Sequence, residues 1–289
     1  MSPRRNARAA APRAPVRRSA TRGRARALGQ HFLRDRSVIG RIVELVAPSR
    51  QDLVVEIGPG RGALTESLAA CSGRLLALEI DLQLAADLQG HFASAPRVEV
   101  RQSDARRFDY ASLRALLPDP AGRVLVVGNL PYSVGKPILA ALVEAGPVID
   151  EMALMLQKEV AERVAAAPGG KTYGALSVLT QVAAAVRLAF MVPPGAFSPP
   201  PQVDSAVLHL RPYREPPVPL GDPARFAAVV RAAFSQRRKS LGNSLAAGLG
   251  SGAERARGLA AAAGIDPGRR AETLSLAEFA ELAAAFAAP

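Results

Sequence analysis

Short apolar runs alternate along this chain with segments of helical periodicity. Five runs typical of buried strands occupy residues 53–57, 75–78, 98–104, 124–129 and 152–156. Strand followed by helix, repeated several times, predicts a mostly parallel sheet with helices on both faces. Two later runs, near 186–192 and 203–210, have no long helix between them. We therefore expect an antiparallel pair at the edge of the sheet.

Some helices can be assigned from their ends and their apolar spacing. Asp81 is a suitable N-cap for a helix whose inner face holds Leu84 and Leu88. Residues 173–184 are also predicted to be helical.

The pattern changes after Tyr213. Residues 215–219 form a Pro-rich stretch typical of a stiff linker. Beyond it, Asp222 and Pro223 begin a helix, and Ser275 with Glu278 forms a capping box before the last helix. The sequence therefore predicts a basic tail over 1–26, an α/β domain over 27–213 and a small all-helical domain over 214–289.

The positive charge is concentrated at the N-terminus. The chain has a net charge of +12, and nine of its Arg residues, with no acid, lie in the first 26 residues. The remainder carries 28 basic and 25 acidic residues. We expect the tail to be disordered, because it lacks large apolar residues. A non-specific RNA-binding arm is a second interpretation. An organelle transit peptide ranks last, because three Pro residues oppose an amphipathic helix.

The composition excludes several classes of protein. One cysteine, Cys71, rules out an internal disulfide framework, and three widely separated His residues argue against a metal cluster, so we expect no metal. No apolar run approaches the ~20 residues that span a membrane, and the N-terminus lacks the apolar core of a signal peptide. We therefore expect a cytoplasmic protein with no membrane partner.

Three acidic or Gly-rich features follow consecutive predicted strands. The segment 58–62, Gly-Pro-Gly-Arg-Gly, forms a strand-to-helix turn that lets a ligand approach the backbone. Glu79 follows 21 residues after Gly58, where an acid can accept hydrogen bonds from ribose hydroxyls. This pair does not distinguish NAD from S-adenosylmethionine, and Glu79 as a simple helix cap stays open. Asp104, after the third strand, is either a loop cap or an acceptor for the amine of a bound adenine.

Asn129-Leu130-Pro131-Tyr132 ends the fourth strand and indicates the chemistry. The exocyclic amine of adenine is a poor nucleophile, because its lone pair is delocalised into the ring. The side-chain oxygen of Asn129 and the carbonyl of Pro131 are suited to accept its two N–H bonds and draw the nitrogen toward tetrahedral geometry. Tyr132 can stack on a flipped base. The alternative is a Pro-containing turn with a core Tyr.

These motifs resemble those of the ribosomal small-subunit RNA adenine dimethyltransferases. The resemblance runs from Leu28 to the final helix and leaves out only the tail. It is carried by segments 29–33, 58–62, 129–132, 197–205 and 234–245, together with Glu79 and Asp104. It implies a Rossmann-like class I S-adenosylmethionine-dependent methyltransferase sheet with a small helical C-terminal domain.

The resemblance also implies an activity and a set of site residues. The activity is dimethylation of the N6 amines of two adjacent adenosines in the 3′-terminal hairpin loop of 16S rRNA during small-subunit biogenesis. S-adenosylmethionine is the implied methyl donor, an assembling 30S subunit the partner, and a monomer the expected state. The implied catalytic residues are Asn129, Pro131 and Tyr132. The implied donor contacts are His31, Leu33, Gly58, Glu79, Asp104 and Asn129.

Other candidates leave alternatives open. The family often has Asn where this chain has His31, so a side-chain contact there would make donor affinity pH-dependent, whereas a backbone contact would not. Phe197 either walls the target-adenine pocket opposite Tyr132 or fills the core. Arg237, Arg238 and Lys239, expected on a helix, are either a patch that binds rRNA phosphates or a solvated face.

Three rival functions remain. A large-subunit rRNA adenine dimethyltransferase shares the donor motifs, although the basic triplet and the Pro-rich segment near Phe197 favour the small subunit. A non-catalytic ribosome-assembly factor would retain the fold, but intact Asn129, Pro131 and Tyr132 oppose it. A dehydrogenase is the remote option.

Overall fold

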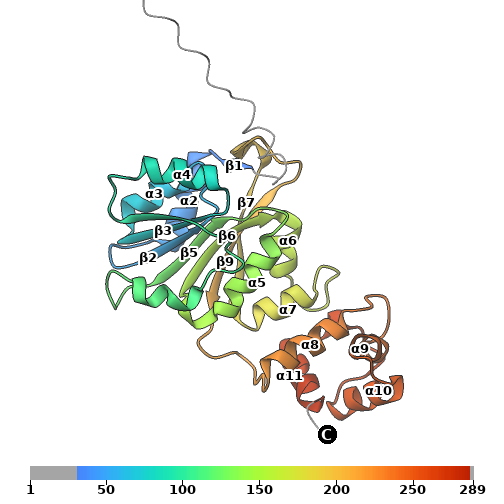
Figure 1. Cartoon of the computed structure of the whole chain (residues 1–289). Coiled ribbons are helices and arrows are strands. Elements are labelled where there is room, and N and C mark those ends of the chain that lie inside the picture. The colour runs from blue at the N-terminus through green and yellow to red at the C-terminus, as the bar shows by residue number, and fades with distance from the viewer. Residues whose placement is uncertain (1–30, 287–289) are drawn as a thin grey trace, which may run out of the picture. The chain divides into compact units, whose positions relative to one another are not determined.

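The structure is a computed structural model that describes residues 31–286. The basic tail, residues 27–30 and residues 287–289 lie outside the described residues. The main sheet has seven strands in the order β4-β3-β2-β5-β6-β9-β7 (Figure 1). Its strands are β2 (Leu53–Ile57), β3 (Arg74–Glu79), β4 (Val98–Gln102), β5 (Val124–Asn129), β6 (Glu151–Gln157), β7 (Ala184–Val192) and β9 (Ser205–Pro212).

The strand directions confirm the predicted architecture. Strands β2 to β6 pair in parallel, and β9 pairs antiparallel with both β6 and β7. All seven predicted strands are present, with ends that differ by a few residues. The helices of this region are α2 (Arg36–Val46), α3 (Ala63–Cys71), α4 (Leu82–His91), α5 (Gly135–Ala145), α6 (Lys158–Val164) and α7 (Ala175–Gln181). Short 3-10 turns cover Tyr110–Leu116, Gly146–Val148 and Pro194–Ala196.

Helices cover both faces of the sheet because alternate strand residues face opposite ways. On β2, Val55 packs in the cluster that includes Leu139 of α5, whereas Val54 packs in the cluster that includes Ile42 of α2 and Leu68 of α3. All residues of β2 are buried, as expected for a central parallel strand.

A second, two-stranded sheet was not predicted. β1 (Phe32–Leu33) pairs antiparallel with β8 (Phe197–Ser198). Two residues are too few to show strand periodicity in a sequence, so only the folded chain reveals the pair.

Two local predictions were wrong. Helix α7 covers Ala175–Gln181 rather than 173–184, because Ala184 already pairs with Pro212 in the sheet. On α4, Asp81 is the N-cap as predicted, but Ala85 rather than Leu84 accompanies Leu88 in the core.

The C-terminal region is helical, as predicted. It contains α8 (Pro223–Ala233), α9 (Leu241–Leu249), α10 (Ala253–Ala262) and α11 (Leu276–Ala285), with a 3-10 turn at Ala271–Thr273. The predicted capping box is present before α11, where Ser275 and Glu278 each accept from the other's backbone N–H. The apolar cluster of these helices also takes in Tyr173 and Val178, at α7, so the segment just before β7 packs with them. The domain division at residue 213 stays a prediction.

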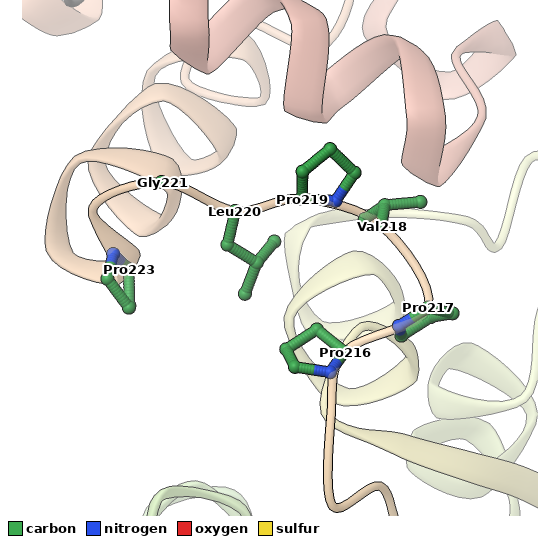
Figure 2. Close-up of a pocket in the computed structure, with 7 residues that line it drawn as sticks. All are labelled: Pro216, Pro217, Val218, Pro219, Leu220, Gly221 and Pro223. Carbon is green, nitrogen blue, oxygen red and sulfur yellow. The ribbon is translucent and has the colours of Figure 1, made fainter.

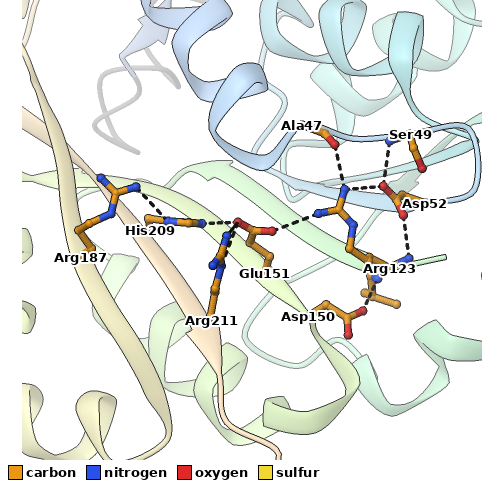
Figure 3. A network of polar contacts seen from close by, with 10 residues as sticks. Ala47, Ser49, Asp52, Arg123, Asp150, Glu151, Arg187, His209 and Arg211 are labelled. Atoms are coloured by element: carbon orange, nitrogen blue, oxygen red, sulfur yellow. Dashed lines mark hydrogen bonds and ion pairs between the residues drawn. The ribbon is translucent and has the colours of Figure 1, made fainter. Parts of the chain in front are cut away.

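A polar network joins the amino ends of the central strands (Figure 3). Arg123, before β5, donates to Asp52, before β2, at 2.8 Å and pairs with Glu151 of β6 at 3.2 Å. His209 bonds the same Glu151 through Nε2, while Arg187 donates to its Nδ1 at 3.2 Å. Because Nδ1 accepts, Nε2 carries the proton that is donated to Glu151. This network lies at the opposite ends of the strands from the predicted ligand site.

Within residues 31–286, no helix combines the length and apolar character needed to cross a membrane. In the same range, no group of three or more His, Cys, Asp or Glu side chains is arranged to hold a metal ion.

Candidate active site

The turn between β2 and α3 depends on glycine. Gly58, Gly60 and Gly62 have φ values of 69°, 58° and 84°, in the left-handed region that favours glycine. An added side chain would also meet close contacts at two of them. A Cβ on Gly60 would lie 2.8 Å from the ring of Phe32, and one on Gly62 would lie 2.8 Å from Leu88. The turn therefore keeps its backbone close to β1 and α4.

Glu79 lies beside this turn, at the carboxyl end of β3. The residue is 3% exposed, and its Oε2 accepts from the Gly60 N–H at 3.1 Å while Oε1 accepts from the Asp81 N–H at 2.9 Å. Burial raises the pKa of the Glu79 carboxyl, and the backbone hydrogen bonds partly oppose that rise. Each carboxylate oxygen keeps a second lone pair for a ligand hydroxyl.

Glu56 is a residue that the sequence analysis did not single out. It lies in β2, is 2% exposed, and burial raises its pKa to about 8, with nearby Glu79 adding to the rise. The Thr65 hydroxyl opposes the rise, yet Glu56 Oε2 and Thr65 Oγ1 both lack a partner with hydrogen-bond geometry within residues 31–286. The sequence could have pointed to Glu56, because it is the one acidic residue inside the apolar run 53–57.

Asp104 is engaged by a neighbouring arginine. Its carboxylate accepts from the guanidinium of Arg106 at 2.9 Å through Nε and 2.6 Å through Nη2, and from the Arg106 N–H at 3.0 Å. The Arg106 hydrogen bonds hold the pKa of the Asp104 carboxyl below its ordinary value. Both the loop-capping and the adenine-binding interpretations are compatible with this half-buried position.

The backbone of His31 orients Asn129. Asn129 ends β5 and donates from its side-chain Nδ2 to the carbonyl of His31 at 2.9 Å. The side-chain oxygen is thereby left as the acceptor. The imidazole has a different role, because its Nδ1 bonds the carbonyl of Pro199 at 2.8 Å.

Pro131 and Tyr132 begin the loop between β5 and α5. The Pro131 carbonyl accepts from the Val134 N–H at 3.1 Å, which leaves it one lone pair. Tyr132 is half-buried, its hydroxyl lies 2.7 Å from Ser205 Oγ, and its ring lies 5.5 Å from that of His31.

Leu33 and Phe197 face the core instead. Leu33 is 8% and Phe197 1% exposed, and both belong to the apolar cluster beneath α2 and α3. The burial of Phe197 favours its core role over a wall of the base pocket. Any contact between Leu33 and a ligand would use its backbone.

The basic triplet is separate from these residues. Arg237, Arg238 and Lys239 are exposed, as a phosphate-binding patch requires. They lie on the turn between α8 and α9, so their predicted place on a helix was wrong. Helix α8 ends at Ala233, and Phe234 already has non-helical backbone angles.

A hollow elsewhere carries no comparable chemistry. It has a volume of about 450 Å³ and is lined by the Pro-rich linker residues Pro216, Pro217, Val218, Pro219, Leu220, Gly221 and Pro223 (Figure 2). None of these side chains is charged or able to form a hydrogen bond.

Comparison with known proteins establishes the family. A family model described as ribosomal RNA adenine dimethylase matches residues 22–287. The chain belongs to the ribosomal RNA adenine dimethylase family. It is 46% identical over 265 residues to ribosomal RNA small subunit methyltransferase A of Geobacter metallireducens, covering 91% of this chain and 95% of the relative. The protein of the same name from Pseudomonas aeruginosa is 45% identical, with coverages of 88% and 91%.

Solved structures show the same fold. A dimethyladenosine transferase from Plasmodium falciparum has a TM-score of 0.72 at 22% identity, covering 87% of this chain and 96% of that one. The 23S rRNA methyltransferase ErmE has a TM-score of 0.64 at 27% identity, covering 89% and 100%. The Rossmann-like methyltransferase sheet predicted for this adenine dimethylase is therefore confirmed.

The residues of this adenine dimethylase fit a S-adenosylmethionine donor. The glycine turn carries no side chain of its own at Gly58, Gly60 and Gly62, and each oxygen of the buried Glu79 carboxylate beside it keeps a free lone pair. Glu56 Oε2, buried in the adjoining strand β2, is a polar atom without a hydrogen-bond partner within residues 31–286. Of the implied contacts, Gly58, Glu79, Asp104 and Asn129 lie at the carboxyl ends of β2 to β5 or just beyond, and the His31 carbonyl joins them through Asn129.

Proposed function

We infer that this protein dimethylates the N6 amines of two adjacent adenosines in the 3′-terminal hairpin loop of 16S rRNA, with S-adenosylmethionine as the methyl donor. The observation that carries the inference is Asn129 at the end of β5, held by the His31 carbonyl at 2.9 Å so that its side-chain oxygen is the acceptor. The small-subunit methyltransferases are 45–46% identical to this chain, against 27% for ErmE, which disfavours the large-subunit alternative.

The chain's own groups activate the target amine. Asn129 Oδ1 and the Pro131 carbonyl accept its two N–H bonds, which draws the nitrogen toward tetrahedral geometry and localises its lone pair. The Tyr132 ring stacks on the flipped base. S-adenosylmethionine supplies an electrophilic methyl group. No strong general base is required, because the methylated nitrogen is cationic and loses its proton readily.

Donor binding is assigned to the acidic side chains at the strand ends. Glu79 accepts from ribose hydroxyls with the lone pairs that Gly60 and Asp81 leave free. Asp104 accepts from the adenine amine, in competition with Arg106. His31 contributes through its carbonyl, and Leu33 through its backbone.

The decisive experiment is methyl transfer from labelled donor to small subunits that lack the modification, with large subunits and duplex DNA alongside. We expect dimethyladenosine in the nucleoside digest of the small subunit alone. Transfer to large-subunit RNA would instead support the large-subunit enzyme.

The non-catalytic alternative is tested by Tyr132→Ala. We expect this variant to bind RNA and to lose turnover, because the stacking surface is removed and the fold is kept. Equal support of subunit assembly by wild type and Tyr132→Ala would favour an assembly factor.

We propose further that the substrate is 16S rRNA within an assembling 30S subunit, and that the protein acts as a cytoplasmic monomer. The exposed Arg237, Arg238 and Lys239 support a phosphate-binding role for the helical domain, proposed to span 214–289. Faster transfer to precursor subunits than to naked 16S rRNA would support this substrate, and sedimentation of the pure protein measures its oligomeric state.

A further inference from the structure

Ser205 is a buried serine whose hydroxyl reaches the catalytic loop. It is the first residue of β9 and is 0% exposed. Its Oγ lies 2.7 Å from the Tyr132 hydroxyl, and that is its one side-chain hydrogen bond within residues 31–286. A buried hydroxyl without a partner costs free energy, so this contact satisfies Ser205 as well as Tyr132.

Tyr132 itself is not fixed by burial. Its ring is half-buried, unlike the fully buried Phe197 and Tyr173. Packing alone therefore does not enclose the ring, and its orientation depends on specific contacts. These contacts are the Ser205 hydroxyl at the tip of the ring and the tilted His31 imidazole, with a ring separation of 5.5 Å.

Both contacts come from segments distant in sequence. Ser205 is 73 residues from Tyr132, and His31 is itself tied to Pro199 by the 2.8 Å bond from Nδ1. The hydroxyl serves no purpose in stacking, for which a phenyl ring suffices. A Tyr with its hydroxyl bonded to a buried strand residue is suited to hold a stacking ring at one angle.

We propose that Ser205 is a positioning residue, whose hydrogen bond to Tyr132 sets the angle of the ring that stacks on the target adenine. The inference rests on the proposed function, because it presumes that Tyr132 receives a base. Through Tyr132, Ser205 also steadies the adjacent Pro131 carbonyl that accepts from the target amine. Ser205 touches neither donor nor target.

The test is a double-mutant cycle with Ser205→Ala, Tyr132→Phe and both together. We expect each single variant to lower kcat about 10-fold, because small misplacements of a reacting group are costly. The double variant should be no slower than Tyr132→Phe, since both remove the same bond. The KM for the donor should stay unchanged in all three.

Ser177→Ala is the matched control. Ser177 is also 0% exposed, and its Oγ donates to the Arg163 carbonyl, away from the catalytic loop. It should lose thermal stability and keep kcat. A Ser205→Ala variant with wild-type kcat, or losses that add in the double variant, would overturn the inference.

A second readout does not depend on activity. Burial raises the pKa of the Tyr132 phenol, and the Ser205 hydrogen bond lowers it. Subtracting the ultraviolet titration of Tyr132→Phe from that of wild type isolates this phenol, and in Ser205→Ala its ionisation should move to higher pH. An unmoved titration would contradict the hydrogen bond. Absent transfer by the wild type would overturn the proposed function, whereas the titration tests the Ser205 contact separately.

Discussion

Glu56 places a carboxyl inside an otherwise apolar strand. Burial raises its pKa to about 8, so the folded protein holds this proton far more tightly than the unfolded chain does. The unfolded chain releases the proton from pH ~4.5 upward, and wild-type stability therefore falls as pH rises from there to about 8.

Glu56→Gln removes this pH dependence. We expect the variant to match the wild type near pH 5 and to exceed it by a few kcal/mol at pH 8, in the absence of donor. Thermal melting at the two pH values measures the difference. Glu66→Gln, at an exposed position on α3, is the control and should show no such gain. Equal melting curves for Glu56→Gln and wild type at pH 8 would contradict the buried charge.

Substitution of His31 distinguishes a role of its backbone from a role of its side chain. The Asn129 amide bonds the His31 carbonyl, which every residue type retains. We therefore expect His31→Asn to leave the donor KM unchanged between pH 6 and 8, as measured by initial rates at saturating RNA. A donor KM that varies with pH in the wild type and not in His31→Asn would show that the imidazole contacts the donor.

At the scale of elements, the glycine-rich turn between β2 and α3 packs against β1. Gly60 has φ 58° and packs against Phe32, so an Ala there meets both backbone strain and a close contact. Gly90, near the end of α4, has nothing within 4 Å of an added Cβ. The two glycines therefore allow a matched comparison.

Gly60→Ala and Gly90→Ala should have opposite effects. We expect Gly60→Ala to lose about 1–2 kcal/mol of stability and to bind donor more weakly, because the left-handed turn is strained. Gly90→Ala should gain about 0.5–1 kcal/mol, because Ala favours a helix over Gly. Chemical denaturation and donor titration measure both. If Gly60→Ala is destabilised but binds donor normally, the turn is not part of the donor site.

At the scale of the whole molecule, two clusters of basic residues are candidates for RNA binding. One is the exposed turn of Arg237, Arg238 and Lys239, and the other is the Arg-rich tail, outside the described residues. Phosphate contacts release counterions, so a region that binds phosphates makes the affinity for RNA more dependent on salt concentration.

Replacing Arg237, Arg238 and Lys239 by Ala should weaken RNA binding and leave the donor KM unchanged. We expect the slope of log K against log [salt] to become shallower by about 2–3 units, since each phosphate contact contributes ~0.7–0.9. Arg97→Ala, at an exposed position before β4, is the control and should not change the slope. An unchanged slope in the triple variant would mean that the three residues form a solvated face and do not bind phosphates.

Deletion of residues 1–26 tests the tail. If the tail is an RNA-binding arm, the deletion reduces the salt slope while the melting temperature stays the same. A slope equal to that of the full chain would rule out the arm and favour a basic extension without a binding role.

Local sequence determined the strands, the glycine turn and the acids and amide at the strand ends, because apolar runs and turn residues act over a few neighbouring positions. The bonds of Asn129 with His31 and of Tyr132 with Ser205 join residues 98 and 73 positions apart, so only the tertiary structure decided them. The same holds for the burial of Phe197 and the packing of α7 with the C-terminal helices. A sequence pattern shows which residue types alternate, whereas the partner of a buried polar group depends on which strands become neighbours.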